Sequence, residues 1–208
     1  MTHHVRIKIC GVRDQIALDT AVEAGADFIG FVRWPGSPRF VEAEEAAGLA
    51  ASLPRQVEPV GLFVNAPIRE ILDWPHQWVQ LHGDEDETVA AALRAEGRNV
   101  IRGFRFEEGQ VARWDGCAAV DRLLVDGSSV GGTGEAFDHD ALARILPTTE
   151  TPILVAGGLS PENVARVVHD CRPWGVDVSS GVESSRGVKD PERIESFCRA
   201  ARTGLADR

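Results

Sequence analysis

The chain has 208 residues, of which 43% are hydrophobic and 26% are charged, and its formal net charge is −10 at pH 7. This length and composition predict a single globular domain over residues 1–208, with enough chain to bury a substantial core. The acidic balance argues against a nucleic-acid partner, because a phosphate backbone is bound by a basic face. A small anionic ligand is not excluded, since it needs only a local positive site.

The cysteines and the chain start indicate a reducing compartment. No two of the cysteines form a C-x-x-C pair, a zinc spacing or a disulfide framework. No stretch approaches the roughly 18 apolar residues of a membrane span, and no apolar signal region follows Met1. We therefore expect a cytoplasmic protein with no metal site and no membrane contact. No sequence feature indicates an oligomeric state.

Short apolar runs alternate with amphipathic stretches from one end of the chain to the other, as in strands followed by helices. The expected strands are Arg6–Cys10, Phe28–Val32, Pro59–Val64, Trp78–His82, Val100–Phe104, Arg122–Asp126, Ile153–Ala156 and Val176–Ser179. The expected helices are Asp14–Ala24, Glu42–Ser52, Ile68–Trp74, Glu85–Glu96, a short one near Glu107–Asp115, Asp138–Leu146, Pro161–His169 and Asp190–Ala201.

Eight strand–helix repeats predict an α/β fold, a single-domain (β/α)8 TIM barrel. The strands are continuous apolar runs, as in a parallel sheet that is covered by helices and packed within. Ser160-Pro161 and Asp190-Pro191 each pair an N-cap residue with proline at the first helical position. An open doubly wound sheet is the alternative, but repeats of roughly 25 residues favour closure. Two long loops, Arg33–Val41 and Gly127–Phe137, would then lie on the active face.

The joints that follow the last two expected strands are rich in glycine and serine. Gly157-Gly158 follows the seventh strand, and Ser180-Gly181 follows the eighth. Glycine lets a backbone approach an anion closely, and a helix N-terminus offers free N–H groups. In tandem, these joints predict a phosphate site at one rim of the barrel.

A thiol and a carboxylate end two of the strands whose carboxyl ends would face a ligand. Cys10 and Asp126 lie on strands one and six, where they could divide the roles of base and acid. The alternative for Cys10 is a small core residue, because buried free cysteine is common. The alternative for Asp126 is a turn residue before Gly127.

Two further basic side chains belong to the same expected rim. Arg39, in the constrained segment Ser37-Pro38-Arg39, is suited to bidentate binding of a carboxylate, although a solvated surface arginine is the alternative. His82 either contacts the ligand or is a satisfied histidine of the rim.

Strand alternation predicts a buried ion pair. Lys8 shares a face with Cys10, and Asp177 shares a face with Ser179 on the strand that neighbours strand one in a closed barrel. An unpaired buried charge is costly, so we expect Lys8 and Asp177 to pair inside the barrel.

The ordered set of motifs resembles the phosphoribosylanthranilate isomerase family of tryptophan biosynthesis over almost the whole chain. The segments that carry the resemblance are Lys8-Ile-Cys10-Gly11, Ser37-Pro-Arg39, Val79-Gln80-Leu-His82-Gly83, Leu124-Val-Asp126, Gly131-Gly-Thr133-Gly134, Gly157-Gly158-Leu-Ser-Pro-Glu162-Asn163-Val and Asp177-Val-Ser-Ser180-Gly181-Val-Glu183. Single pieces occur in many phosphate-binding barrels, whereas the whole set is specific. The sequence departs from many relatives at Arg33 and His139, and Arg33 would add positive charge at the mouth of the site.

This resemblance implies an Amadori rearrangement of N-(5-phosphoribosyl)anthranilate without a cofactor. It implies that Cys10 is the base, that Asp126 is the acid and that Arg39 binds the anthranilate carboxylate. The phosphate would lie at the two joints, on Gly157, Gly158, Ser180 and Gly181.

Other functions remain as alternatives. The histidine-pathway Amadori isomerase acts on a related substrate, but it resembles this chain less because its first strand carries an aspartate where Cys10 stands. A non-catalytic phosphosugar-binding barrel would not need Cys10, Asp126 and Arg39 together. A dinucleotide enzyme is disfavoured, because no G-x-G-x-x-G follows the first strand.

Overall fold

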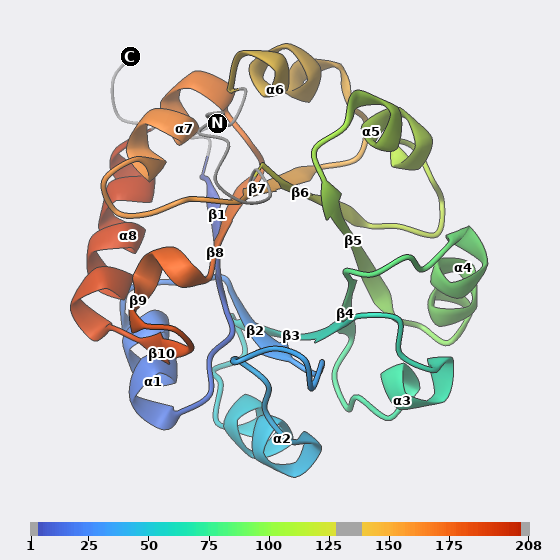
Figure 1. Ribbon diagram of the computed structural model, residues 1–208, viewed down its shortest axis with the longest axis horizontal. Coiled ribbons are helices and arrows are strands. Elements are labelled where there is room, and N and C mark those ends of the chain that lie inside the picture. The colour runs from blue at the N-terminus through green and yellow to red at the C-terminus, as the bar shows by residue number, and fades with distance from the viewer. Residues whose placement is uncertain (1–3, 128–138, 205–208) are drawn as a thin grey trace.

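Eight parallel strands close into a barrel surrounded by helices in the computed structural model, which describes residues 4–127 and 139–204 (Figure 1). The strands are β1 (Arg6–Cys10), β2 (Phe28–Val32), β3 (Glu58–Phe63), β4 (Trp78–Leu81), β5 (Asn99–Arg105), β6 (Arg122–Asp126), β7 (Ile153–Ala156) and β8 (Gly175–Val178). The helices are α1 (Gln15–Glu23), α2 (Ala43–Ala51), α3 (Ile68–Leu72), α4 (Glu87–Ala95), α5 (Glu108–Trp114), α6 (His139–Ile145), α7 (Val164–Cys171) and α8 (Pro191–Thr203).

The strands pair in chain order, and β8 closes the ring against β1. The (β/α)8 barrel is therefore confirmed, and an open doubly wound sheet is wrong. Of the two long loops, Arg33–Val41 is described, whereas the second lies outside the described residues beyond Gly127.

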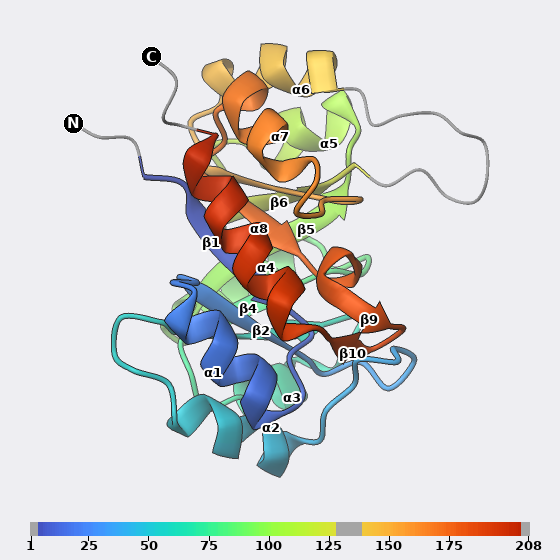
Figure 2. The same ribbon diagram turned by 90° about the vertical axis from the view of Figure 1, so that its left-hand side faces the viewer.

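The joint after β8 is more elaborate than the sequence predicts. A 3₁₀ turn, η2 (Ser180–Val182), leads into a hairpin of β9 (Glu183–Ser185) and β10 (Val188–Lys189) before α8 begins. Figure 2 shows this hairpin beyond one end of α8, next to the loop that follows β2. The chain therefore reaches across the rim of the barrel at this point instead of entering a helix directly.

Helix α7 begins later than predicted, with Asn163 as its N-cap instead of Ser160. The Ser160 N–H donates to Asn163 Oδ1 at 2.8 Å, and the Asn163 side chain donates to the Gly158 carbonyl at 2.8 Å. The serine and the asparagine thus close a turn that lengthens the joint after β7. By contrast, α8 begins as predicted, because the Asp190 carboxylate accepts the Arg193 N–H at 3.1 Å.

Side chains fill the barrel in layers, because every second residue of a strand points inward. One apolar cluster inside the barrel contains Phe28, Val60, Ile101, Leu124, Leu154 and Ala156. A smaller apolar group, made of Cys10, Val32 and Leu62, lies nearer the carboxyl ends. Trp78 and Trp174 pack against the first cluster, and the guanidinium of Arg122 lies 4.5 Å from the Trp174 ring centroid. The barrel interior is therefore packed with apolar side chains, and Leu124 and Ala156 of this cluster reach the cavities described below.

Candidate active site

The side chains predicted for catalysis and carboxylate binding line one cavity. This cavity has a volume of about 380 Å³ and lies at the carboxyl ends of the strands. Its walls include Cys10 from β1, Arg39 from the loop after β2, His82 after β4 and Asp126 at the end of β6. The structure therefore brings together residues that are far apart in the sequence. Trp34 also lines this cavity and is 44% exposed.

The two glycine- and serine-rich joints line a second cavity beside the first. It has a volume of about 200 Å³, and its walls include the four residues predicted for phosphate, Gly157, Gly158, Ser180 and Gly181. Four residues line both cavities, namely Arg39, Asp126, Asp177 and Ser179. A ligand whose phosphate lies at the joints would therefore extend directly towards Asp126 and Arg39.

Backbone geometry explains why the joints after β7 and β8 carry glycine. A Cβ atom on Gly181 would lie 1.8 Å from the Leu159 carbonyl oxygen, so the two joints touch backbone to backbone. Gly157 and Gly158 have φ angles of +89° and +64°, in the left-handed region that glycine adopts most readily. A Cβ on Gly158 would meet no atom within 4 Å, so space remains beside this backbone for a ligand.

Cys10 lies next to a buried ion pair. Lys8 is fully buried, and its ammonium donates to Asp177 Oδ1 at 2.7 Å. The two residues are register partners on β1 and β8, so the predicted pairing is confirmed. A Cβ on Gly30 would lie 2.9 Å from Cys10 Sγ and 3.1 Å from Lys8 Nζ. The glycine on β2 thus provides the space in which both side chains lie.

Burial and charge act on the Cys10 thiol in opposite directions. Burial raises its pKa above the ordinary value of 9.0, whereas the positive charges of Lys8 and Lys189 lower it. Burial also opposes the charged form of Lys8, but Asp177 and Cys10 outweigh this effect and raise the pKa of the lysine. The pair is thus an ammonium and a carboxylate next to the sulfur.

Arg39 is held by a carboxylate that the sequence did not identify. Its Nε and Nη2 donate to the two oxygens of Glu183 at 2.6 and 2.9 Å. The aliphatic part of the arginine crosses Gly11, where a Cβ would lie 2.7 Å from Arg39 Cδ. The Gly187 N–H adds a hydrogen bond to Glu183 at 3.0 Å. Arg39 is therefore fixed by the β9–β10 hairpin and is not a solvated surface arginine.

Lys189 completes this network from β10. Its ammonium lies 3.0 Å from Glu183 Oε1 and donates to the Ser179 carbonyl at 2.9 Å. The Ser179 hydroxyl donates in turn to the Cys10 carbonyl at 3.0 Å. Burial would raise the pKa of Glu183, but hydrogen bonds from Arg39 and Gly187 and the charge of Lys189 lower it to about 2. Glu183 is thus an anion at neutral pH.

The imidazole of His82 packs against Gly103, an inward-facing residue of β5. A Cβ on Gly103 would lie 2.2 Å from His82 Nδ1. The Gln80 amide lies 3.1 Å from the same nitrogen and can only donate, so Nδ1 accepts and Nε2 carries the proton. Burial lowers the pKa of His82 below 6.5. A neutral imidazole therefore faces the cavity as a hydrogen-bond donor.

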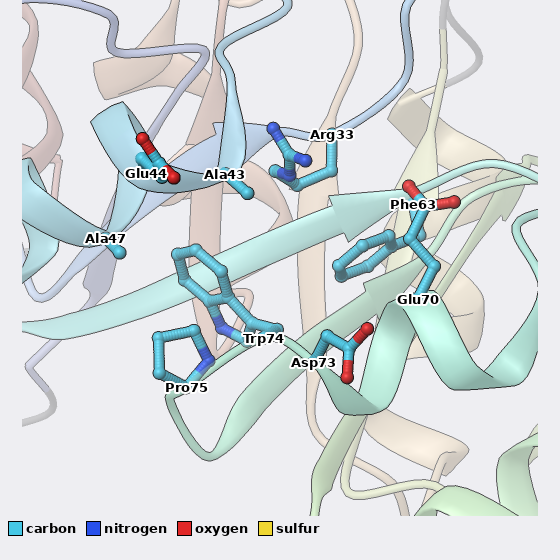
Figure 3. Close-up of a pocket in the computed structure, with 9 residues that line it drawn as sticks. All are labelled: Arg33, Ala43, Glu44, Ala47, Phe63, Glu70, Asp73, Trp74 and Pro75. Atoms are coloured by element: carbon cyan, nitrogen blue, oxygen red, sulfur yellow. The ribbon is translucent and has the colours of Figure 1, made fainter.

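Arg33 does not lie in the wall of the candidate active site, contrary to the expectation that it adds charge at the mouth. It lines a separate cavity of about 330 Å³, together with Ala43, Glu44, Ala47, Phe63, Glu70, Asp73, Trp74 and Pro75 (Figure 3). Its guanidinium donates to the Val41 carbonyl and lies 5.3 Å from the Phe40 ring centroid. Arg33 thus fastens the loop that carries Arg39.

Neither a metal cluster nor a membrane helix occurs in the described part of the chain. Within residues 4–127 and 139–204, histidine, cysteine and carboxylate side chains form no group of three that could hold a metal ion. No described helix is long and apolar enough to cross a membrane.

A family model and individual relatives of this chain both indicate the same protein family. The family described as N-(5'phosphoribosyl)anthranilate (PRA) isomerase matches residues 7–200. The chain is 42% identical over 202 residues to the N-(5'-phosphoribosyl)anthranilate isomerase of Chromohalobacter salexigens, covering 92% of each chain.

Solved structures agree with this result. The phosphoribosyl anthranilate isomerase of Thermotoga maritima is 35% identical and superimposes with a TM-score of 0.86, covering 95% of this chain and 98% of that one. A further isomerase structure contains reduced 1-(o-carboxyphenylamino)-1-deoxyribulose 5-phosphate. It is 33% identical, with a TM-score of 0.83 and the same coverage.

Proposed function

The chain belongs to the N-(5'-phosphoribosyl)anthranilate isomerase family, and we propose that its two adjoining cavities carry out the reaction of that family. The substrate is N-(5-phosphoribosyl)anthranilate, and the product is 1-(2-carboxyphenylamino)-1-deoxyribulose 5-phosphate. The observation that carries the proposal is that Cys10, Arg39 and Asp126 line one cavity that continues into the glycine-rich joints. The reaction is a step of tryptophan biosynthesis, and we place the enzyme in the cytoplasm.

The phosphate end of the substrate binds at the joints after β7 and β8. Gly158 has open space beside its backbone, and Ser180 adds a hydroxyl to the same wall. Backbone N–H groups at such joints bind anions without a basic side chain, which suits a chain of net charge −10. The joints fix one end of the substrate, so that its ribose extends into the neighbouring cavity.

The anthranilate carboxylate binds at Arg39. Glu183 occupies Nε and Nη2 of the guanidinium, and the remaining N–H groups are available to a second carboxylate. Lys189 keeps this site cationic, because two positive groups surround one glutamate. Trp34 at the mouth of the cavity offers an apolar surface for the aromatic ring.

Acid and base then act on different atoms of the ribose between these anchors. Asp126 donates a proton to the ring oxygen, and the ring opens to an iminium. The Cys10 thiolate removes the proton from C2′, which gives an enolamine that tautomerises to the aminoketose. Cys10 and Asp126 lie on different strands of the barrel, β1 and β6, and both line the cavity, so each can reach its own atom.

Genetic complementation tests the proposal. The gene for this chain should restore growth without tryptophan to a strain that lacks phosphoribosylanthranilate isomerase. Cys10→Ala and Asp126→Asn should each abolish or severely reduce rescue while the protein remains folded. Full rescue by either variant would overturn the role given to that residue, and failure of the parent gene, expressed and folded, would overturn the function.

A further inference from the structure

The lysines of this chain are distributed in an unusual way. Lys8 and Lys189 are its only lysines, and the remaining basic residues among the 22 are all arginine. Both lysine side chains are buried, with side-chain exposures of 0% and 1%. Both also act electrostatically on Cys10. Lysine therefore occurs only where a compact ammonium group is enclosed next to the proposed base.

The first ammonium approaches the sulfur inside the barrel. Lys8 Nζ and Cys10 Sγ both lie within about 3 Å of the point where Gly30 lacks a Cβ atom. Lys8 and Cys10 also share the inward face of β1. A compact ammonium suits this enclosed space better than a larger planar guanidinium does.

The second ammonium approaches from the β9–β10 hairpin. Lys189 contacts the carbonyl and hydroxyl of Ser179 at 2.9 and 3.3 Å, and the same hydroxyl binds the Cys10 carbonyl. The hairpin that carries the lysine also carries Glu183, which fixes Arg39. The group that binds the substrate carboxylate and the group that removes the proton are thus connected through Lys189.

The hydrogen-bonded groups nearest Cys10 carry more positive than negative charge. Three cations, Lys8, Lys189 and Arg39, surround two anions, Asp177 and Glu183. His82 and Asp126 also line the cavity, and burial lowers the pKa of His82 below 6.5. Among these five hydrogen-bonded groups one positive charge is left over, and a thiolate at Cys10 would be stabilised by it.

We propose that Lys8 and Lys189 are positioning residues that prepare Cys10 as the base, by placing two enclosed ammonium groups around its sulfur. The inference rests on the proposed function, since it takes Cys10 as the group that removes the C2′ proton.

The test is the pH dependence of Cys10 alkylation by iodoacetamide in the substrate-free protein. Mass spectrometry of the peptide that contains Cys10 separates it from the other three cysteines. Lys189→Met and Lys8→Met remove one charge each, and Arg55→Met on the exposed loop before β3 is the charge-matched control. We expect the alkylation midpoint to rise by about one pH unit in each lysine variant, so that the rate at neutral pH falls about tenfold. Arg55→Met should match the parent.

A second variant of Lys189 and a pH–rate profile complete the test. Lys189→Arg retains the charge and should keep the midpoint nearer to the parent value than Lys189→Met does, even if Lys8→Met fails to fold. The ascending limb of kcat/KM against pH should move with the alkylation midpoint. Unmoved midpoints in folded lysine variants, or an equal shift in Lys189→Arg, would overturn the inference. A parent protein without isomerase activity would instead overturn the proposed function, because alkylation needs no substrate.

Discussion

Gly181→Ala should disable the phosphate site through a backbone contact. A Cβ at this position would lie 1.8 Å from the Leu159 carbonyl oxygen, whereas real Cβ atoms essentially never come within 3.0 Å. Because the obstacle is backbone, one of the two joints must move by roughly 1 Å, and a displacement of that size costs on the order of 100-fold in rate. The strain should also lower the free energy of unfolding by about 1–3 kcal/mol.

The assay is steady-state kinetics of the purified enzyme, with inorganic phosphate as a competitive inhibitor. We expect kcat/KM to fall about 100-fold and phosphate inhibition to weaken, because the joint no longer presents its N–H groups to the anion. Each kcal/mol of lost stability should lower the melting temperature by about 2–4 °C.

Gly48→Ala is the matched control. Gly48 lies in α2, and a Cβ there would meet no atom within 4 Å. Alanine should raise the free energy of unfolding by about 0.5–1 kcal/mol and leave kcat/KM unchanged, because it favours the helix and is remote from the cavity. Parent kcat/KM and parent phosphate inhibition in Gly181→Ala would refute the role given to the joint.

Two predictions concern the polar groups around the cavity. Glu183→Gln should raise KM roughly 10–100-fold by releasing Arg39, and unchanged KM would contradict the clamp. Because the pKa of Glu183 is lowered to about 2 from 4.5, its contribution to stability is complete above pH 4.5 and is lost as the pH falls towards 2. Acid unfolding should therefore be less steep in Glu183→Gln across that range. At pH 6.5, the ordinary pKa of histidine, nitrogen NMR should show a neutral His82 ring with its proton on Nε2. A ring that is half protonated at this pH would contradict the lowered pKa.

The sequence predicted the barrel because each strand is a continuous apolar run and each helix is an amphipathic stretch, with apolar residues at helical spacing. It also predicted the Lys8–Asp177 pair, since strand alternation and closure of the ring together place both side chains inside. The sequence also placed Cys10, Asp126 and Arg39 at one rim, because a barrel directs the carboxyl ends of its strands to one face, and the three residues line one cavity.

The contacts made by the hairpin could not be predicted in the same way. Glu183 and Lys189 lie in β9 and β10, strands of three and two residues, which are too short to show a period. The contact of Glu183 with Arg39 depends on the path of a turn at Gly187, whose φ is +85°. Asn163 replaced Ser160 as the N-cap for a similar reason, because both side chains can cap and the length of the turn decides between them. Inward-facing Gly30 and Gly103 were an available signal for enclosed side chains.

The most direct test of the assignment of base and acid is the rate of conversion of N-(5-phosphoribosyl)anthranilate by Cys10→Ala and Asp126→Asn. Each substitution removes one proton-transfer group and leaves Arg39 and the phosphate joints intact. The account predicts that kcat falls about 10²–10⁴-fold in each variant while KM changes little, because both groups act on the transition state. Parent kcat in either folded variant would contradict it.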